Sequence, residues 1–197
     1  MQEGLLYKYY KTHDKITMHI IAAIYFIFAL GIFIIPGDIL SSYPICAKSV
    51  NFMKQYFPNI QIFSDVSPFK QEIEFYTSYM WVVGLLLAAE LVFYVTCQYI
   101  IFVDKDVDAK ENIKNISPLG LLFYFGLSVF GIKVYYTGYI VTNGVTFLSW
   151  HFEIDFATKF EIFKYISLFQ AAFSASVYFI IFLVYVSFYE FIKYKNR

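Results

Sequence analysis

Arginine is nearly absent from this 197-residue chain, in which Arg197 is the sole arginine among fifteen basic residues. A planar guanidinium suits bidentate phosphate recognition, whereas lysine offers only a point charge. Fifteen acidic residues balance the basic ones, so the net charge is zero and no basic surface for DNA or RNA is indicated. We therefore expect no nucleic-acid partner.

Cysteine and histidine are too few and too scattered for redox or metal chemistry. Cys46 and Cys97 make no disulfide framework, and their expected positions on opposite halves of a membrane predict two free thiols. His13, His19 and His151 share no helical face at ligand spacing, and no Glu-x-x-His pair accompanies them. The sequence also has no nucleophile elbow and no phosphate-cradling glycine loop. We expect no metal, no cofactor and no catalytic residue.

Charge is scarce and apolar residues are abundant, which places the chain among membrane proteins. Charged residues make up 15% of the sequence, against 59% hydrophobic and 23% aromatic residues. Four apolar runs approach the roughly 20 residues that cross a hydrocarbon core: 16–36, 79–103, 117–137 and 165–189. Because lipid leaves open backbone groups unsatisfied, each run should be an α-helix. The sequence predicts one all-α domain over 1–197, a four-helix transmembrane bundle with structured outer loops.

The basic residues that flank these runs predict the orientation of the chain. Lysines gather in 8–15 before the first run, in 105–114 between the second and third, and in 193–197 after the fourth. The positive-inside rule places these segments and both termini in the cytoplasm, and the first and third loops outside. Membrane lipid is therefore an expected partner.

Both outer loops carry patterns of their own. In "KSVNFMKQYF", residues 48–57, apolar residues repeat at helical spacing, which favours a short helix at the membrane interface. Asn143-Gly144 in "YIVTNGVTF" is typical of the tight turn of a β-hairpin. Trp150 and Phe152 then alternate with polar residues up to Asp155. This stretch is either a structured loop on the helix ends or an edge that binds a protein partner.

One carboxylic acid stands inside an apolar run. Glu90 in "GLLLAAELVFY" lies eleven residues into the second predicted span, about 16 Å from its outer end and close to the bilayer middle. A charge there costs at least about 2.5 kcal/mol, so Glu90 should be protonated, paired, or next to a polar cavity. Three interpretations stay open: a protonated acid hydrogen-bonded to a neighbouring helix, an ion pair with Lys133 in the third span, and a transport or catalytic acid.

Other polar and small residues in the spans predict helix contacts. The amides of Gln98 and Gln170 can bond across helices, which strengthens association in lipid. The pairs Gly84–Ala88 and Ala171–Ala175 form small faces that let helices approach closely. The second and fourth spans should therefore be neighbours.

Three stretches, together with the predicted threading, resemble a known family. The first loop contains "YFPNIQIFSDVSPF", with Pro58, Ile60 and Pro68; the third contains "TNGVTFLS"; the chain ends in the basic tail "EFIKYKNR". This arrangement resembles the four-span immunity proteins that bacteria make against pore-forming colicins. Those proteins have a Leu-Pro-Ser-Ile stretch followed by an Asx-Pro, a threonine-rich position in the third loop, and cytoplasmic ends. The chain departs from the family's pattern at Glu90 and in its more acidic second loop.

The resemblance implies a binding protein of the bacterial inner membrane, whose partner is the membrane-embedded pore domain of a toxin. Such a protein needs no catalytic residue. Two alternatives stay open: an accessory subunit of a larger membrane complex, such as a respiratory, oxidase or secretion assembly, and a small-molecule site in which Asp38 and Glu90 resemble the acid pair of the sterol-isomerase fold. The candidate partner-binding residues are Glu90, Lys133, Gln98, Gln170, Trp150, Phe152 and Asp155.

Overall fold

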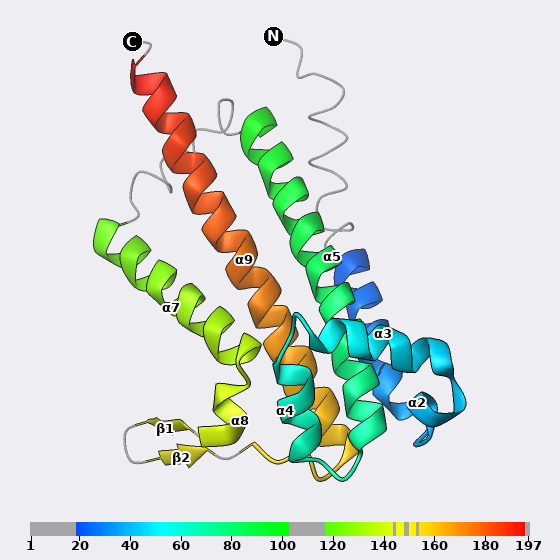
Figure 1. Ribbon diagram of the computed structural model, residues 1–197. Helices are drawn as coiled ribbons and strands as arrows, with labels where there is room; N and C mark the ends of the chain where they lie inside the picture. The colour runs from blue at the N-terminus through cyan, green and yellow to red at the C-terminus, as the bar shows by residue number, and fades with distance from the viewer. Residues whose placement is uncertain (1–18, 103–116, 144, 148–149, 153, 196–197) are drawn as a thin grey trace.

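The computed structural model describes residues 19–102, 117–143, 145–147, 150–152 and 154–195, and most of them are helical (Figure 1). Of the four predicted spans, three are helices that are long and apolar enough, within the described residues, to cross a membrane. The central one, α9, packs against α5 on one side and α7 on the other. The apolar parts of these helices are Lys70–Phe93 of α5 (Lys70–Phe102), Leu119–Tyr136 of α7 (Pro118–Tyr136) and Lys159–Val184 of α9 (Lys159–Lys195).

The first predicted span is described only in part. Its apolar helix covers His19–Phe33, and the last turn tightens into the 3-10 helix η1 (Leu30–Phe33). At 1.5 Å per residue this helix is about 22 Å long, which is less than a hydrocarbon core of about 30 Å. Residues 16–18 of the predicted span lie outside the described residues. The four-span bundle thus stays a prediction.

Three short helices connect the first helix to α5, and one of them was predicted. They are α2 (Ile39–Ser42), α3 (Pro44–Lys54) and α4 (Asn59–Asp65). The helix expected within 48–57 is confirmed as α3, although it begins earlier because Pro44 fits the first turn of a helix. Val50 of α3 is buried against the bundle, and Met53 and Phe57 pack on the same core.

The third loop differs from its prediction in the position of the turn. Asn143 is the last residue of helix α8 (Tyr139–Asn143), which begins after Gly138, a residue with a φ of 64°. Two short antiparallel strands follow, β1 (Val145–Phe147) and β2 (Trp150–Phe152), in which Val145 pairs with Phe152 and Phe147 with Trp150. Asn143, which the sequence places in a turn, is therefore the end of a helix, and Gly144 lies outside the described residues.

Two helices begin before their apolar runs because side chains cap them. At the start of α9, the Thr158 hydroxyl accepts from the Glu161 N–H at 3.2 Å, and a Glu161 carboxylate oxygen accepts from the Thr158 N–H at 3.0 Å. This reciprocal capping box satisfies two backbone donors that a helix end leaves free. Before α5, the buried Ser67 hydroxyl accepts from the Phe69 N–H and donates to the Phe156 carbonyl. Ser67 thus ties the start of α5 to the segment that leads into α9.

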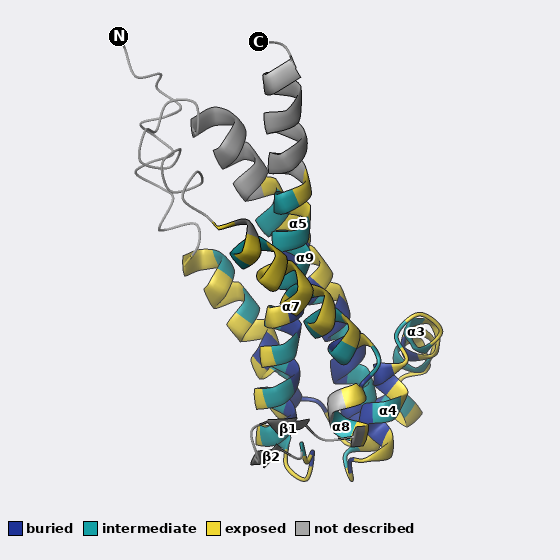
Figure 2. Ribbon diagram, turned by 90° about the vertical axis from the view of Figure 1, so that its left-hand side faces the viewer, coloured by how far each residue is buried: buried dark blue, intermediate teal, exposed yellow. Residues whose placement is uncertain are grey.

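An aromatic core holds the outer-loop helices against the long helices. Trp81 stacks on Phe57 with ring centroids 4.1 Å apart and meets Tyr135 at 4.9 Å and Phe173 at 4.8 Å. Its indole N–H donates to the Asn59 amide oxygen at 2.9 Å, so α4 is bonded to α5 in the interior. Away from this core the long helices are much more exposed, most of all α7 (Figure 2).

Candidate partner-binding groove

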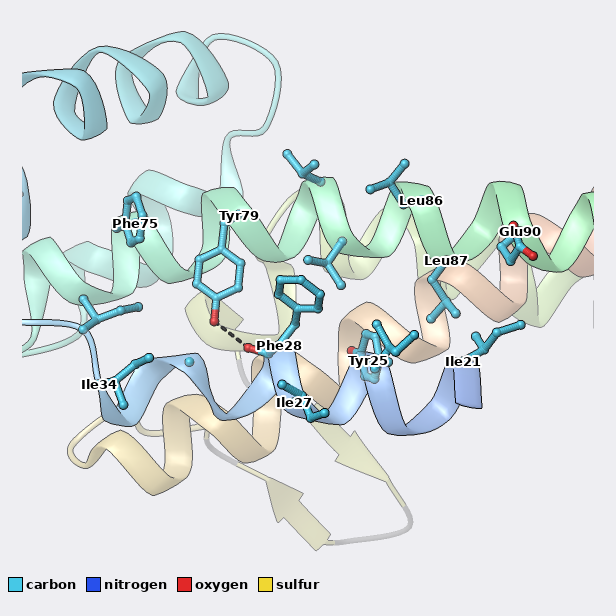
Figure 3. A pocket seen from close by; sticks show the side chains of 15 residues that line it. Ile21, Tyr25, Ile27, Phe28, Ile34, Phe75, Tyr79, Leu86, Leu87 and Glu90 are labelled. Atoms are coloured by element: carbon cyan, nitrogen blue, oxygen red, sulfur yellow. Dashed lines mark hydrogen bonds between the residues drawn. The ribbon is translucent and has the colours of Figure 1, made fainter. Parts of the chain in front are cut away.

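An apolar groove of about 980 Å³ runs between the first helix and α5 (Figure 3). Ile34 and Phe75 line one end of it, and Ile21 and Glu90 line the other (Figure 3). The walls between them are aliphatic and aromatic side chains that are partly or largely exposed. In a membrane protein, such a surface faces lipid or another apolar chain.

The first helix is fastened to α5 and α9 by tyrosine hydroxyls. Tyr79 donates to the Phe28 carbonyl at 2.7 Å, and Tyr76 donates to the Ala29 carbonyl at 2.8 Å. Both carbonyls lie where the α-helix gives way to η1. Tyr25 donates to the Ser167 carbonyl of α9. The tyrosine hydroxyls that line the groove are therefore already hydrogen-bonded within the chain.

Gly31 allows the close approach that forms the floor of the groove. A Cβ atom at this position would lie 3.0 Å from the Tyr79 Cζ and closer still to its hydroxyl oxygen. Any larger residue would push Tyr79 away from the first helix, because real Cβ contacts are almost never this short. The glycine thus sets the separation of the two walls.

Glu90 is the single charged residue among the described residues that line the groove. Its side chain is exposed, and in the part of the chain that the structure describes no hydrogen bond or ion pair engages it. The predicted hydrogen bond to a neighbouring helix is therefore not seen among the described residues. A carboxylate next to lipid is costly. The described fold provides no partner that would offset this cost for Glu90.

Lys133 does not meet Glu90. It is exposed on α7, near the end of that helix, and no ion pair joins the two side chains within the described residues. α7 packs mainly against α9, whereas Glu90 lies where α5 faces the first helix. The ion pair that the sequence suggests is therefore not seen among the described residues.

Gln170 lies inside the bundle rather than on a partner-binding surface. Its side chain is fully buried, and its amide oxygen accepts from the Tyr135 hydroxyl at 2.6 Å. The next turn of α9 bonds to α5, since the Ser174 hydroxyl donates to the Gly84 carbonyl at 2.8 Å. The predicted contact between the second and fourth spans is thus confirmed. On α9 this contact includes the polar residues Gln170 and Ser174 as well as the aromatic Phe173, whereas Ala175 of the predicted small face is exposed.

The other predicted residues are not part of the groove. The side chains of Gln98, Trp150 and Phe152 lie outside those that the structure describes, and Asp155 is exposed after β2. Asp38 precedes α2, bonds to Ser42 and does not line the groove, so it makes no acid pair with Glu90. The described residues contain no group of three or more histidine, cysteine or acidic side chains that could hold a metal ion.

The groove itself was missed, although helical spacing contains a signal for it. Tyr79, Val83 and Glu90 follow one another at intervals of four and seven residues, which places them on one face of α5. Ile21, Tyr25 and Phe28 are spaced similarly on the first helix. What the spacing could not reveal is that these two faces meet each other. Comparisons with protein-family models, with curated proteins and with solved structures find no match to this chain.

Proposed function

We propose that the chain is an integral binding protein of the bacterial inner membrane that neutralises a pore-forming toxin by packing against a helix of its pore domain. The groove is the observation that carries this proposal. From Phe75 to Glu90 it follows α5 for about 22 Å, or four helical turns. Its walls are apolar throughout, with Glu90 as the one charged residue in the lining.

A groove between two helices is the shape into which a third helix packs. Side-chain ridges of an incoming helix can lie in the depression between neighbouring helices, and dispersion contacts then hold it in lipid. The two rims present large side chains for such contacts: Ile27 of the first helix is 68% exposed and Leu86 of α5 is 67% exposed. Recognition of this kind requires shape and apolar surface, and no catalytic group.

The threading of the chain is part of the same proposal. The first helix would begin within 16–19 and act as a fourth span, with both termini and the lysine-rich 105–114 segment in the cytoplasm. The described connections agree with such a threading. Helices α2 to α4 lie at the same end of the long helices as α8 and the two strands (Figure 1). In a chain that crosses the membrane four times, the first and third connections lie on the same side of the membrane.

The test is protection of bacterial cells against purified channel-forming toxins. Cells that produce the chain are treated with a panel of such toxins, and potassium efflux and survival are measured. We expect protection against at least one member of the panel. The variant Leu86→Trp fills the groove and should lose that protection. Phe123→Trp on α7 is the matched control, because Phe123 is 66% exposed and lies outside the groove.

Two results would contradict this proposal in different ways. If the unmodified chain protects against no toxin in the panel, the partner class is wrong. If Leu86→Trp protects as well as Phe123→Trp does, a toxin is the partner but the groove is not where it binds. Both variants must first be shown to reach the membrane in equal amounts.

An accessory-subunit role is favoured by a different observation, the exposure of α7. Only 11% of its apolar span is buried, and Leu122, Phe123 and Phe130 are among its exposed side chains. A larger complex would cover this face with another chain. Extraction from native membranes in mild detergent separates the two roles, because a subunit is recovered in a large particle of fixed stoichiometry and a stand-alone binder in one or two copies.

A further inference from the structure

We infer that the helix in the groove carries a basic side chain, a lysine or an arginine, that pairs with Glu90. This inference rests on the proposed function and names the chemistry by which the partner helix is recognised. The groove supplies the shape that fits a helix, and Glu90 supplies the charge that selects one.

Glu90 differs from the other carboxylates of α5 in having no partner within the described part of the chain. Glu74 is 2.6 Å from the Lys54 ammonium, and Glu72 is 3.9 Å from the Lys159 ammonium. Glu90 engages no side chain of the described residues and is exposed at the end of the groove. The fold neutralises the two acids near the start of α5 and leaves the one that faces the groove.

Among the described residues that line the groove, no other charged group is available to an incoming helix. The Tyr79 hydroxyl in its wall already donates to the Phe28 carbonyl, and the Tyr25 hydroxyl to the Ser167 carbonyl. A basic side chain on the occupant would offset the cost of a carboxylate at an apolar surface and would form a charge-assisted hydrogen bond. Lysine and arginine suit this position because their long apolar stems lie along a hydrophobic surface and carry the charge to a distant partner.

The position of Glu90 also fixes where the basic residue lies in the partner. Glu90 lines one end of the groove and Phe75 the other, about 22 Å away (Figure 3). An occupant that fills the groove therefore has an apolar stretch of about 15 residues, or four turns, with the basic residue at one end. This spacing is a sequence pattern that can be sought in candidate toxins.

The inference is tested with synthetic helices of known sequence. The probe is a leucine-alanine helix of about 21 residues that carries one lysine at the end of a stretch of about 15 apolar residues. Two matched peptides carry glutamine or glutamate at the same position. The full chain is placed in vesicles of phosphatidylcholine, and energy transfer from the labelled chain to each labelled peptide gives an apparent affinity.

We expect the lysine peptide to bind the unmodified chain at least about tenfold more tightly than the glutamine peptide, which is the range measured for polar contacts between helices in lipid. Glu90→Gln should remove this preference, and Glu90→Lys should transfer it to the glutamate peptide. Lys133→Gln is the matched control and should leave the preference unchanged, because Lys133 is exposed on α7.

The outcomes separate this inference from the proposed function. Equal binding of the three peptides that Leu86→Trp abolishes would overturn the charge pairing and leave the groove as a helix site. Binding of no peptide would overturn both the pairing and the groove as a docking site. A lysine preference that persists in Glu90→Gln would assign the recognition to a residue other than Glu90.

Discussion

Replacing Gly84 with alanine should loosen the contact between α5 and α9, on which the whole bundle depends. A Cβ atom at Gly84 would lie 2.6 Å from the Gln170 Cγ and closer still to the amide carbon and nitrogen. Gln170 cannot swing aside into open space, because its side chain is fully buried and its oxygen is bonded to Tyr135. The helices must therefore separate, or Gln170 must give up that bond.

The expected loss of stability follows from two terms. Overfilling a packed interior costs about 1 to 3 kcal/mol, and the lost interhelical hydrogen bond adds about 0.6 to 1.7 kcal/mol. Alanine also favours the helix over glycine by about 1 kcal/mol, which opposes both terms. Gly126→Ala on α7 is the matched control, because nothing lies within 4 Å of a Cβ there. Comparison of the two variants cancels the helix preference and isolates about 2 to 5 kcal/mol.

Denaturation of the purified chain in detergent measures this difference. Rising fractions of sodium dodecyl sulfate unfold the helical bundle, and the fluorescence of the two tryptophans reports the transition. Gly84→Ala should unfold at a lower fraction than Gly126→Ala, and Gly84→Ala combined with Gln170→Ala should recover part of the loss because the shorter side chain makes room. Equal midpoints for Gly84→Ala and Gly126→Ala would refute the steric reasoning.

The same denaturation assay checks two local predictions. Gly138→Ala should cost about 1 to 2 kcal/mol, because a φ of 64° is unfavourable for a residue with a Cβ and that atom would lie 2.9 Å from the Ile62 Cγ2. An unchanged midpoint relative to Gly120→Ala, whose nearest neighbour is 3.8 Å away, would contradict this estimate. Thr158→Ala should cost about 1 kcal/mol, because it removes one half of the capping box with Glu161. If it costs nothing, α9 does not depend on this cap.

Hydropathy predicts the long helices well in their apolar regions and poorly at their outer ends. Hydropathy places the starts of the second and fourth spans at 79 and 165, whereas α5 begins at Lys70 and α9 at Lys159. Hydropathy reports which residues lipid accepts, and helices continue beyond that region when hydrogen bonds support them. The capping box at Thr158 was readable in the sequence, since threonine and glutamate stand three residues apart. The hydrogen bond from Ser67 to Phe156 joins residues 89 apart, and no local pattern reports it.

The turn predicted at Asn143-Gly144 also shows that local composition does not report contacts between distant residues. Asn143-Gly144 has the right composition for a tight turn, but the residues before it form helix α8, which packs next to α4. Gly138 contacts Ile62 of α4, and its positive φ turns the chain into α8. A contact between distant parts of the chain thus accompanies the start of α8, and local composition does not report it.

Polar residues in the spans show most clearly what only three-dimensional structure can decide. Glu90 and Gln170 are both isolated polar residues in apolar runs, and sequence alone makes both of them candidates for partner binding. Gln170 faces α5 and α7, and its amide oxygen accepts from Tyr135. Its Nε2 has no hydrogen-bond partner among the described residues, but the side chain is fully buried over Gly84, away from any surface that a partner could contact. Glu90 faces the groove, where the described fold offers it nothing. Because lipid offers no hydrogen bonds, an exposed polar side chain without an internal partner is the best marker of an external one. That reasoning is why the proposed partner recognition is assigned to the groove rather than to α9.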